Sequence, residues 1–366
     1  MKLKPIFLFL ILIVLAVTAA APFVMPSPAD PLPTEDVSVA APTEPVETAP
    51  EETTEAATEP ITEALTEPEP IVYTLSFVGD CTFGSTDAYR GLESSFISVV
   101  GEDYDYPFAN VRHIFEADDF TMANLEGPLT EEGTAMEKQF TFRGPTAYTA
   151  IMTGSSVEAV TTSNNHFYDY GEAGMRSTRN ALDDAGIAHA WRGSFLYTTQ
   201  SGLTIGVYCD DFSFEKQDMV DSFAALREQG AEVIVCAFHW GVEKAYTPTA
   251  DQTIWGHTAI DAGADIVYGH HPHVLQPIEY YGGGVIFYSL GNFSFGGNTW
   301  ASDMDTAILQ LQFLREADGS LTMGDTVIVP CSISSTSGIN NYQPTPLEEG
   351  SAAWDRVMQK LEGTYR

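Results

Sequence analysis

The chain has 366 residues and a formal net charge of −35, with 51 acidic and 16 basic side chains. This excess of acidic residues argues against nucleic acid as a partner, because the phosphate backbone would be repelled. It would also repel an acidic polymer unless metal ions or a local basic patch intervened. Beyond residue 70 the chain is long enough for one large α/β domain or two small ones.

The N-terminal segment is predicted to export the chain. Lys2 and Lys4 precede an apolar stretch, Pro5–Met25, which is long enough for the core of a secretory signal or for one membrane-spanning helix. Ala19–Ala21 resembles a cleavage site, but the length of the apolar stretch favours an uncleaved anchor. We therefore expect residues 1–25 to be a signal anchor with the rest of the protein on the extracytoplasmic side of the membrane; the alternative is secretion after cleavage of a signal peptide.

Residues 26–70 are predicted to be a disordered linker. They repeat Thr-Glu-Pro units and contain no Lys or Arg. Such a segment lacks the apolar side chains whose burial would offset the loss of chain entropy on folding.

Six apolar, strand-like runs follow the linker, and a polar cluster comes directly after each. The runs are Tyr73–Val78, Phe120–Ala123, Val157–Thr162, Glu232–Phe238, Ala264–Tyr268 and Gly284–Tyr288. Helical spacing of apolar residues occurs between them, at Gly171–Ala185, Met219–Gln229 and Ile254–Ala262. This alternation predicts a layered α/β fold, in which the carboxyl ends of the strands bring their polar clusters to one edge.

Two carboxylates occupy such strand ends. Asp80 follows a buried run and Gly79, and Glu126 precedes the turn formed by Gly127-Pro128. Both positions suit a metal ligand, although a turn-capping Asp and an ordinary surface Glu are the structural alternatives. Asn124 is suited equally to orienting Glu126 and to binding substrate.

Five of the eight histidines also follow strand-like runs. Asn164-Asn165-His166 offers an amide oxygen for a metal and an imidazole for proton transfer, with Asp169 close enough in sequence to orient the ring. A helix N-cap at Asn165 is the structural alternative. His239 follows another run, and Gly269–His273 places three imidazoles in four positions. In an extended segment His271 and His273 would face the same side, which leaves His270 outside the ligand pair.

The remaining features are structural. Cys81, Cys209, Cys236 and Cys331 show no CxxC spacing and are interpreted as small apolar residues. A Cys209–Cys236 disulfide is conceivable in an exported protein. Residues 336–366 are expected to form a C-terminal extension with a short helix.

From about Val72 to Ser335 the chain resembles the CapA-type poly-γ-glutamate capsule synthesis proteins, whose domain is related to calcineurin-like metallophosphoesterases. The resemblance depends on motifs that occur in a fixed order. They are Gly79-Asp80, Asn124-Leu125-Glu126, Asn164-Asn165-His166 with Asp169-Tyr170-Gly171, His239-Trp240-Gly241 with Glu243, Gly269–His273 and Tyr288–Phe293.

The resemblance implies that residues 71–335 form a four-layer α/β/β/α sandwich of the metallophosphoesterase type around one or two divalent metal ions. The implied metal ligands are Asp80, Glu126, Asn165, His239, His271 and His273. His166, oriented by Asp169, would be the acid or charge stabiliser. Residues expected to support the ligands or face the substrate are Asn124, Asn164, Glu243, His270 and Asn292.

Two departures from the related phosphoesterases leave the number of metals open. Thr82 stands where those enzymes have a histidine, and Glu126 stands where they often have a bridging Asp. Nitrogen and oxygen ligands suit Mn²⁺, Fe, Zn²⁺ or Mg²⁺, and their spacing does not choose among these.

The implied function is in the cell envelope, in the biosynthesis of a capsule, of poly-γ-glutamate or of another surface polymer. The intact ligand set favours a metal-dependent hydrolase or transferase. The alternative is a non-catalytic, membrane-anchored subunit that binds the polymer within a synthesis or export complex. The expected partners are an anionic surface polymer such as poly-γ-glutamate and other membrane subunits of that complex.

Overall fold

The computed structural model of the protein describes residues 69–211 and 215–366. The predicted anchor over residues 1–25 and nearly all of the predicted linker lie outside the described residues. Within the described ranges, no helix is both long enough and apolar enough to cross a membrane.

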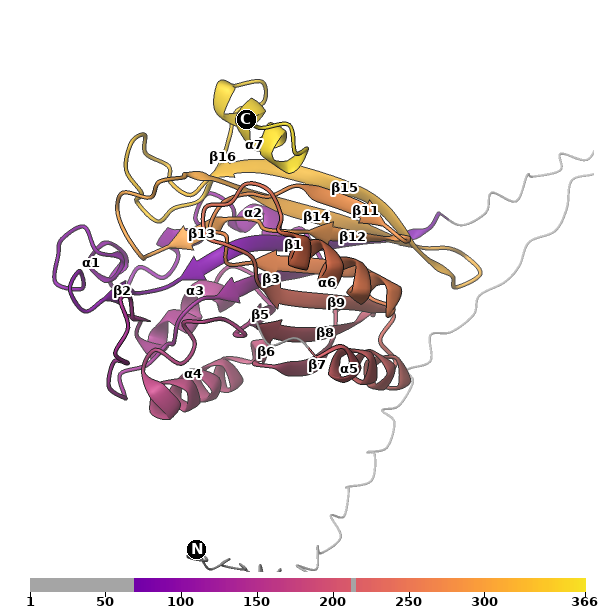
Figure 1. Ribbon diagram of the computed structural model, residues 1–366, viewed down its shortest axis with the longest axis horizontal. Coiled ribbons are helices and arrows are strands. Elements are labelled where there is room, and N and C mark those ends of the chain that lie inside the picture. Colours follow the sequence, from indigo (N-terminus) through magenta and orange to yellow (C-terminus); the bar gives the residue numbers. More distant parts are fainter. Residues whose placement is uncertain (1–68, 212–214) are drawn as a thin grey trace, which may run out of the picture. The chain divides into compact units, whose positions relative to one another are not determined.

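Two β-sheets form the centre of the domain (Figure 1). The first has the strand order β16-β15-β14-β1-β3-β5-β6, with β13 paired to β1 off this path, and the second has the order β11-β12-β10-β9-β8-β7. The strands of the first sheet are β1 (Ile71–Thr82), β3 (Phe120–Leu125), β5 (Ala159–Thr161), β6 (Ala188–Ala190), β13 (Asn292–Phe295), β14 (Asp305–Arg315), β15 (Leu321–Ser332) and β16 (Thr345–Pro346). Those of the second are β7 (Gly193–Thr198), β8 (Thr204–Asp211), β9 (Val233–His239), β10 (Ile266–His270), β11 (Ile278–Tyr281) and β12 (Gly284–Phe287). A small separate sheet pairs β2 (Ser85–Thr86) with β4 (Phe142–Arg143).

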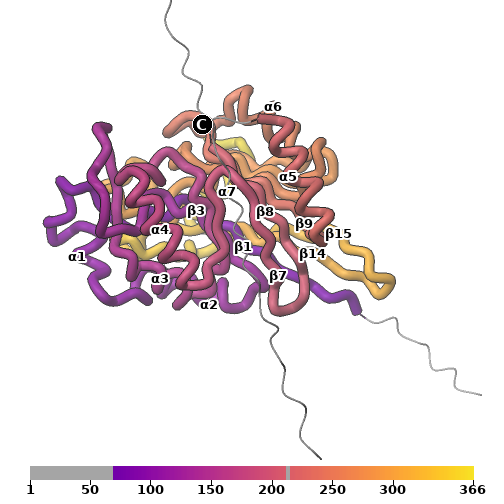
Figure 2. The backbone as a smooth tube through the Cα atoms, turned by 90° about the horizontal axis from the view of Figure 1, so that it is seen from below, coloured from indigo at the N-terminus to yellow at the C-terminus, as the bar shows by residue number. Residues whose placement is uncertain are grey.

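The sheets face each other across a shared apolar core, and helices cover their outer faces. Leu75 and Phe77 of β1 pack in this core with Val207 of β8 and Val235 of β9. Separate apolar clusters join the outer face of each sheet to its helices, which Figure 2 shows on opposite sides of the molecule. The first sheet is covered by α1 (Phe96–Val100), α2 (Arg112–Phe115), α3 (Thr149–Thr153) and α4 (Gly171–Ala185), and the second by α5 (Lys216–Glu228) and α6 (Ala250–Asp261). The predicted α/β/β/α layering is therefore observed.

Strand β1 changes its register where it approaches the edge that carries the polar clusters. Its pairing with β3 shifts between Phe77 and Asp80. Gly79 lies within this shift, and any Cβ there would collide with the backbone carbonyl of Gly291. The close approach allows β13 to pair in parallel with β1, with Asp80 opposite Asn292. A glycine is thus required to bring these two polar side chains together.

The C-terminal residues pack on the same domain. Strand β16 pairs with β15, and the expected short helix is α7 (Ala352–Leu361). Val357 and Leu361 of this helix join the core between the sheets. This end of the chain thus contributes to the domain's main apolar core.

The sequence located the longer helices and the strands β1, β3, β5, β9, β10 and β12. It missed β6 and β8, which pair in parallel with β5 and β9. β7, β14 and β15 pair antiparallel with their neighbours and were not predicted. All four cysteines are buried and free, so the Cys209–Cys236 disulfide considered above is absent. Their interpretation as small apolar residues agrees with this burial.

Candidate metal centre

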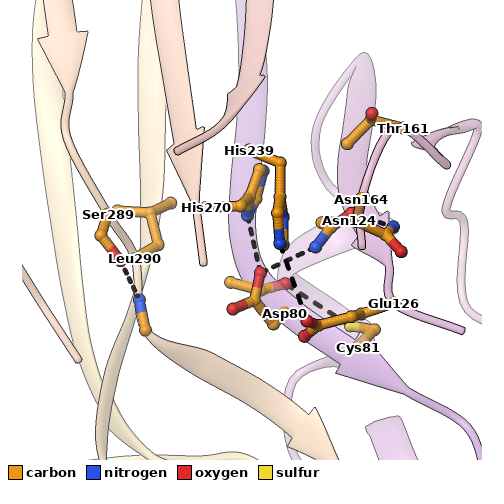
Figure 3. A network of polar contacts seen from close by, with 12 residues as sticks. Asp80, Cys81, Asn124, Glu126, Thr161, Asn164, His239, His270, Ser289 and Leu290 are labelled. Atoms are coloured by element: carbon orange, nitrogen blue, oxygen red, sulfur yellow. Dashed lines mark hydrogen bonds and ion pairs between the residues drawn. The ribbon is translucent and has the colours of Figure 1, made fainter. Parts of the chain in front are cut away.

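Polar side chains from both sheets meet at the carboxyl ends of the parallel strands. Asp80 and Asn124 are paired in register on β1 and β3, and His239 and His270 are paired on β9 and β10. Figure 3 shows the two histidines reaching toward Asp80 and Glu126. The polar residues that were predicted to share one edge of the fold therefore lie together in the structure.

Asp80 is fully buried and is surrounded by donors. Its Oδ1 accepts hydrogen bonds from Asn124 Nδ2 at 2.8 Å and from His270 Nδ1 at 3.0 Å. Its Oδ2 lies 3.0 Å from His273 Nδ1. Burial alone would raise the pKa of Asp80, but the hydrogen bonds from His270 and His273 hold that pKa well below its usual value. Asp80 is therefore an anion.

Glu126 is equally buried but lacks such donors. It is 1% exposed, and neither carboxylate oxygen has a hydrogen-bond partner among the described residues. His273 Nε2 lies 3.7 Å from Glu126 Oε1, and His239 Nε2 lies 3.9 Å from it. Burial raises the pKa of Glu126 to about 8, against the opposing effect of His273. A buried carboxylate without donors is costly, and a bound cation would satisfy it.

Two groups of side chains have the composition and spacing of metal ligands. Asp80, Glu126 and His273 place one potential ligand atom each within 4.8 Å of one another, and Glu243, His271 and His273 do the same. Both groups contain His273, so they adjoin. This donor set of carboxylates and imidazoles fits one or two divalent cations. Glu243 was predicted to support the ligands or to face the substrate, yet its carboxylate is placed where a ligand could be.

Two of the imidazoles are held in the neutral form that binds metals. Burial lowers the pKa of His239 well below its ordinary value, and burial together with the charge of His273 lowers the pKa of His271 to about 4. His273 differs: burial would lower its pKa, but Glu126 and Asp80 raise it to about 10.

The histidine loop has an uncommon backbone conformation. His271 and His273 have φ of 97° and 56°, and Lys244 in the facing loop has φ of 62°. Positive φ is unfavourable for residues that have a Cβ atom, and such conformations are found often at functional sites. They also correct the sequence argument, because His271 and His273 do not lie in an extended segment and do not meet through strand alternation. The backbone N–H of Lys244 donates to the carbonyl of Pro272 at 2.7 Å, which joins the two loops.

His166 and Asp169 form a pair beside this centre. His166 Nδ1 lies 2.8 Å from Asp169 Oδ2, and burial lowers the pKa of His166. Asp169 is itself held by Lys138 Nζ at 2.5 Å and by the backbone N–H of Phe142 at 2.6 Å. With Nδ1–H donated to Asp169, the neutral ring would present Nε2 as a proton acceptor.

The predicted asparagines link the remaining groups. Asn164 Nδ2 donates to Asn124 Oδ1 at 3.0 Å, and Asn165 Oδ1 lies 2.8 Å from His239 Nε2. Asn292 Oδ1 lies 3.0 Å from His273 Nδ1. Thr82, which occupies the position of a histidine in the related phosphoesterases, is buried. Its hydroxyl has no hydrogen-bond partner within the described residues. The structure thus brings all of the predicted site residues together.

A cavity of about 230 Å³ opens beside these groups. His166, Glu243 and His273 belong to its lining, and most of the remaining wall is apolar. The aromatic side chains in the wall are Phe140, Phe142, Phe295 and Trp300. Neither they nor Lys138 were among the predicted site residues, although Phe295 and Trp300 closely follow the motif that ends at Phe293.

The C-terminal helix fixes two segments that line this cavity. Lys360 of α7 is 3% exposed, and its Nζ lies 2.6 Å from Asp303 and 2.7 Å from Asp305. The hydroxyl of Tyr246 donates to the same Asp303 at 2.9 Å. Lys360 therefore ties the loop that follows Trp300 to the loop that carries Glu243 and Lys244.

These features define an α/β sandwich with a buried site suited to divalent cations. Residues 74–194 and 191–297, more than half of the chain, match the family described as bacterial capsule synthesis protein PGA_cap. The protein belongs to this family.

Two curated relatives carry related names. The PGA biosynthesis protein CapA of Bacillus subtilis is 27% identical over 317 residues, covering 79% of this chain and 78% of the relative. The capsule biosynthesis protein CapA of Bacillus anthracis is 27% identical over 298 residues, covering 70% of this chain and 71% of the relative.

Two solved structures show distant likeness. One is the NAD nucleotidase NadN of Haemophilus influenzae, with a TM-score of 0.38, 11% identity and coverage of 81% of this chain and 63% of that one. The other is the purple acid phosphatase PPD1 from yellow lupin (Lupinus luteus) seeds, with a TM-score of 0.30, 11% identity and coverage of 72% and 55%. This chain spans less than two thirds of either.

Proposed function

We propose that this capsule-family protein is a metal-dependent hydrolase of the metallophosphoesterase type, which acts on a phosphoester bond during biosynthesis of a bacterial surface polymer. The family and the names of the relatives support the link to capsule and poly-γ-glutamate biosynthesis. The observation that carries the catalytic proposal is the pair of buried carboxylates, Asp80 and Glu126, which imidazoles surround; within the described residues neither oxygen of Glu126 has a hydrogen-bond partner. A merely structural core would not favour that arrangement.

Each side chain has a role in this proposal. Asp80, Glu126, Asn165, His239, His271 and His273 would hold one or two divalent cations, and Glu243 is a further candidate ligand. A cation bound there would supply Lewis acidity toward a phosphoryl oxygen. Asn124 and Asn164 hold Asp80 and the strand ends in place. His270 donates to Asp80, and Asn292 contacts His273, so both orient ligands.

His166 is the proposed proton-transfer group. Asp169 fixes its ring through Nδ1, and Lys138 and the Phe142 N–H fix Asp169. The ring lines the cavity, as does that of His273. A substrate in the cavity would therefore place its leaving oxygen near an imidazole that can exchange a proton.

The N-terminal sequence completes the proposal. The apolar stretch Pro5–Met25 would anchor the protein in the membrane, and the acidic linker would hold the domain on the extracytoplasmic side. The surface polymer and membrane subunits of its synthesis machinery would then be its partners.

The test begins with the full-length protein purified without chelator. Elemental analysis should find one or two divalent cations per chain, and the loaded protein should hydrolyse bis(p-nitrophenyl) phosphate. If it retains no cation after reconstitution with Mn²⁺ or Zn²⁺, the metal centre is refuted. If it is fully loaded but turns over no phosphoester, ester or γ-glutamyl substrate, the catalytic proposal is refuted and a polymer-binding subunit is favoured.

A further inference from the structure

We infer that the cavity beside the candidate metal centre binds an uncharged sugar ring next to the bond that is cleaved. This inference rests on the proposed phosphoesterase function, because it names the group attached to the phosphorus. Its basis is the cavity wall, which is largely aromatic and has few cationic side chains, whereas a chain of carboxylates would require several cations.

Two aromatic side chains of the cavity wall lie against the two histidines that line it. The rings of Phe140 and Phe142 are nearly parallel, with centroids 6.5 Å apart. The ring of Phe142 lies 4.6 Å from that of His166, and Phe295 lies 5.8 Å from His273. A group packed on this wall would therefore be attached close to the reacting bond.

The outermost aromatic side chains are unusually exposed. Trp300 is 74% exposed and Phe140 is 49% exposed. Large apolar side chains gathered in solvent at the mouth of a cavity mark a binding surface. Aromatic faces pack well against the C–H face of a sugar ring, which buries apolar area while the ring hydroxyls remain free for hydrogen bonds.

The charges of the wall disfavour a polycarboxylate. Lys244 is the one lysine or arginine among the described lining residues, and Glu243 stands next to it. A γ-linked glutamate polymer carries a carboxylate in every repeat, so successive repeats would need successive cations. The formal charge of −35 adds a general repulsion.

A few neutral polar groups complete the cavity. Asn292, Asn298 and Ser302 lie in its lining. Amide and hydroxyl groups donate and accept hydrogen bonds, as ring hydroxyls require. Apolar walls with a small number of polar groups are typical of sites that fix the orientation of a neutral ligand.

The test measures binding rather than turnover. Isothermal titration of the full-length, metal-loaded protein would compare glucose 1-phosphate and N-acetylglucosamine 1-phosphate with glycerol 3-phosphate, phenyl phosphate and tetra-γ-glutamate. At least one sugar phosphate should bind about tenfold more tightly than glycerol 3-phosphate. Trp300→Ala should remove most of this advantage, while Trp300→Phe should retain most of it, and metal content should be unchanged in both.

A matched control is Tyr280→Ala, which removes an aromatic side chain that is 65% exposed on β11 and does not line the cavity. It should leave all affinities unchanged. Equal affinity for the sugar phosphates and glycerol 3-phosphate, or no effect of Trp300→Ala, would overturn the inference. Tighter binding of tetra-γ-glutamate or of phenyl phosphate, weakened by Trp300→Ala, would assign the cavity to the polycarboxylate or to an aryl group instead.

Failure of the proposed phosphoesterase function can be distinguished from failure of the sugar site. Methyl glucoside and methyl N-acetylglucosaminide carry no phosphate, so their titration into wild type and Trp300→Ala reports on the cavity alone. A glycoside that binds wild type more tightly than Trp300→Ala supports the sugar site even if no phosphoester is hydrolysed. Hydrolysis without any sugar preference would retain the phosphoesterase and reject the sugar site.

Discussion

Carboxylates lie at both ends of the parallel strands, and their partners differ. At the amino ends, Asp119 accepts the backbone N–H of Thr74 at 2.8 Å, and Glu158 accepts that of Thr121 at 2.7 Å. Before β10, Asp265 likewise accepts an N–H, from Ile234 at 2.7 Å. These carboxylates accept backbone N–H groups near the amino ends of neighbouring strands, which is a structural role.

At the carboxyl ends the hydrogen-bond partners of Asp80 are side chains, Asn124 and the imidazoles of His270 and His273, whereas Glu126 lacks them within the described residues. Burial of an acidic side chain therefore does not by itself identify a functional site in this protein. The distinction lies in whether the backbone satisfies the carboxylate or leaves it to an external cation.

The largest effect should come from comparing two substitutions, one of a carboxylate at the carboxyl ends of the strands and one of a carboxylate at the amino ends. Asp80→Asn removes a charged ligand and should abolish both bound metal and phosphoester hydrolysis. Glu158→Gln, which retains an oxygen for the Thr121 N–H, should leave metal content unchanged. Elemental analysis of both variants checks this. Equal metal loss in the two would show that the ends do not differ as described.

Within the carboxyl end, the metal ligands and the proton-transfer group should separate. His166→Ala should lower kcat by about 10²- to 10⁴-fold, as expected for loss of a general acid or base, and should retain nearly all bound metal. His271→Ala should lower the metal content itself. Steady-state kinetics with parallel metal analysis checks the difference, and equal metal loss would contradict the assigned role of His166.

Lys360, Asp303 and Asp305 also form a buried charged group, but here the lysine neutralises the carboxylates. This group should therefore bind no metal ion. Lys360→Met removes the buried cation from Asp303 and Asp305, of which Asp305 retains Arg356 at 2.6 Å, and should lower the free energy of unfolding by about 3 kcal/mol. Lys360→Arg keeps the charge and should lose less. In the variants that remain folded, metal content should be normal while KM rises, because both cavity loops depend on Lys360. Denaturant titration and kinetics check these outcomes; metal loss with unchanged KM would contradict them.

The smallest expected effect is a pH dependence set at the amino ends. Burial raises the pKa of Asp118 and of Glu158 to about 7, whereas their values in an unfolded chain are about 4. The folded state therefore binds more protons between pH 4 and pH 7, so its stability should fall as the pH rises through this window and then level off. A tenfold difference in proton affinity corresponds to about 1.4 kcal/mol, and screening by solvent at these incompletely buried groups should keep the total change to a few kcal/mol.

Urea titrations at pH 5 and pH 7.5 measure this change. Glu158→Gln should show a smaller difference between the two pH values than wild type, because the variant has lost one titrating group. An unchanged difference would mean that Glu158 does not titrate in this range.

The sequence predicted the elements whose signals are local. Apolar runs followed by polar clusters located the strands that present Asp80, Glu126 and His239, and helical spacing located α4 with its observed bounds. Proximity of the site residues followed from strand polarity alone, since the carboxyl ends of parallel strands share one edge.

The site residues that the sequence did not predict are placed by the paths of the loops. Lys138, Phe140 and Trp300 lie in segments without regular periodicity, and tertiary contacts bring them to the site. Glu243 joins His271 because a backbone hydrogen bond from Lys244 to Pro272 closes two loops against each other. The strained conformations of His271 and His273 likewise arise from those contacts, not from local propensity.

The spacing of the site residues along the chain has a consequence for folding. His270 lies 190 positions beyond Asp80, and the two meet only when both sheets have formed. Closing so long a loop in an unfolded chain is entropically costly, so a cation cannot gather these side chains early, as zinc does in a short finger. Metal capture should therefore follow folding, and the chain as synthesised would reach its native topology before it acquires the ion.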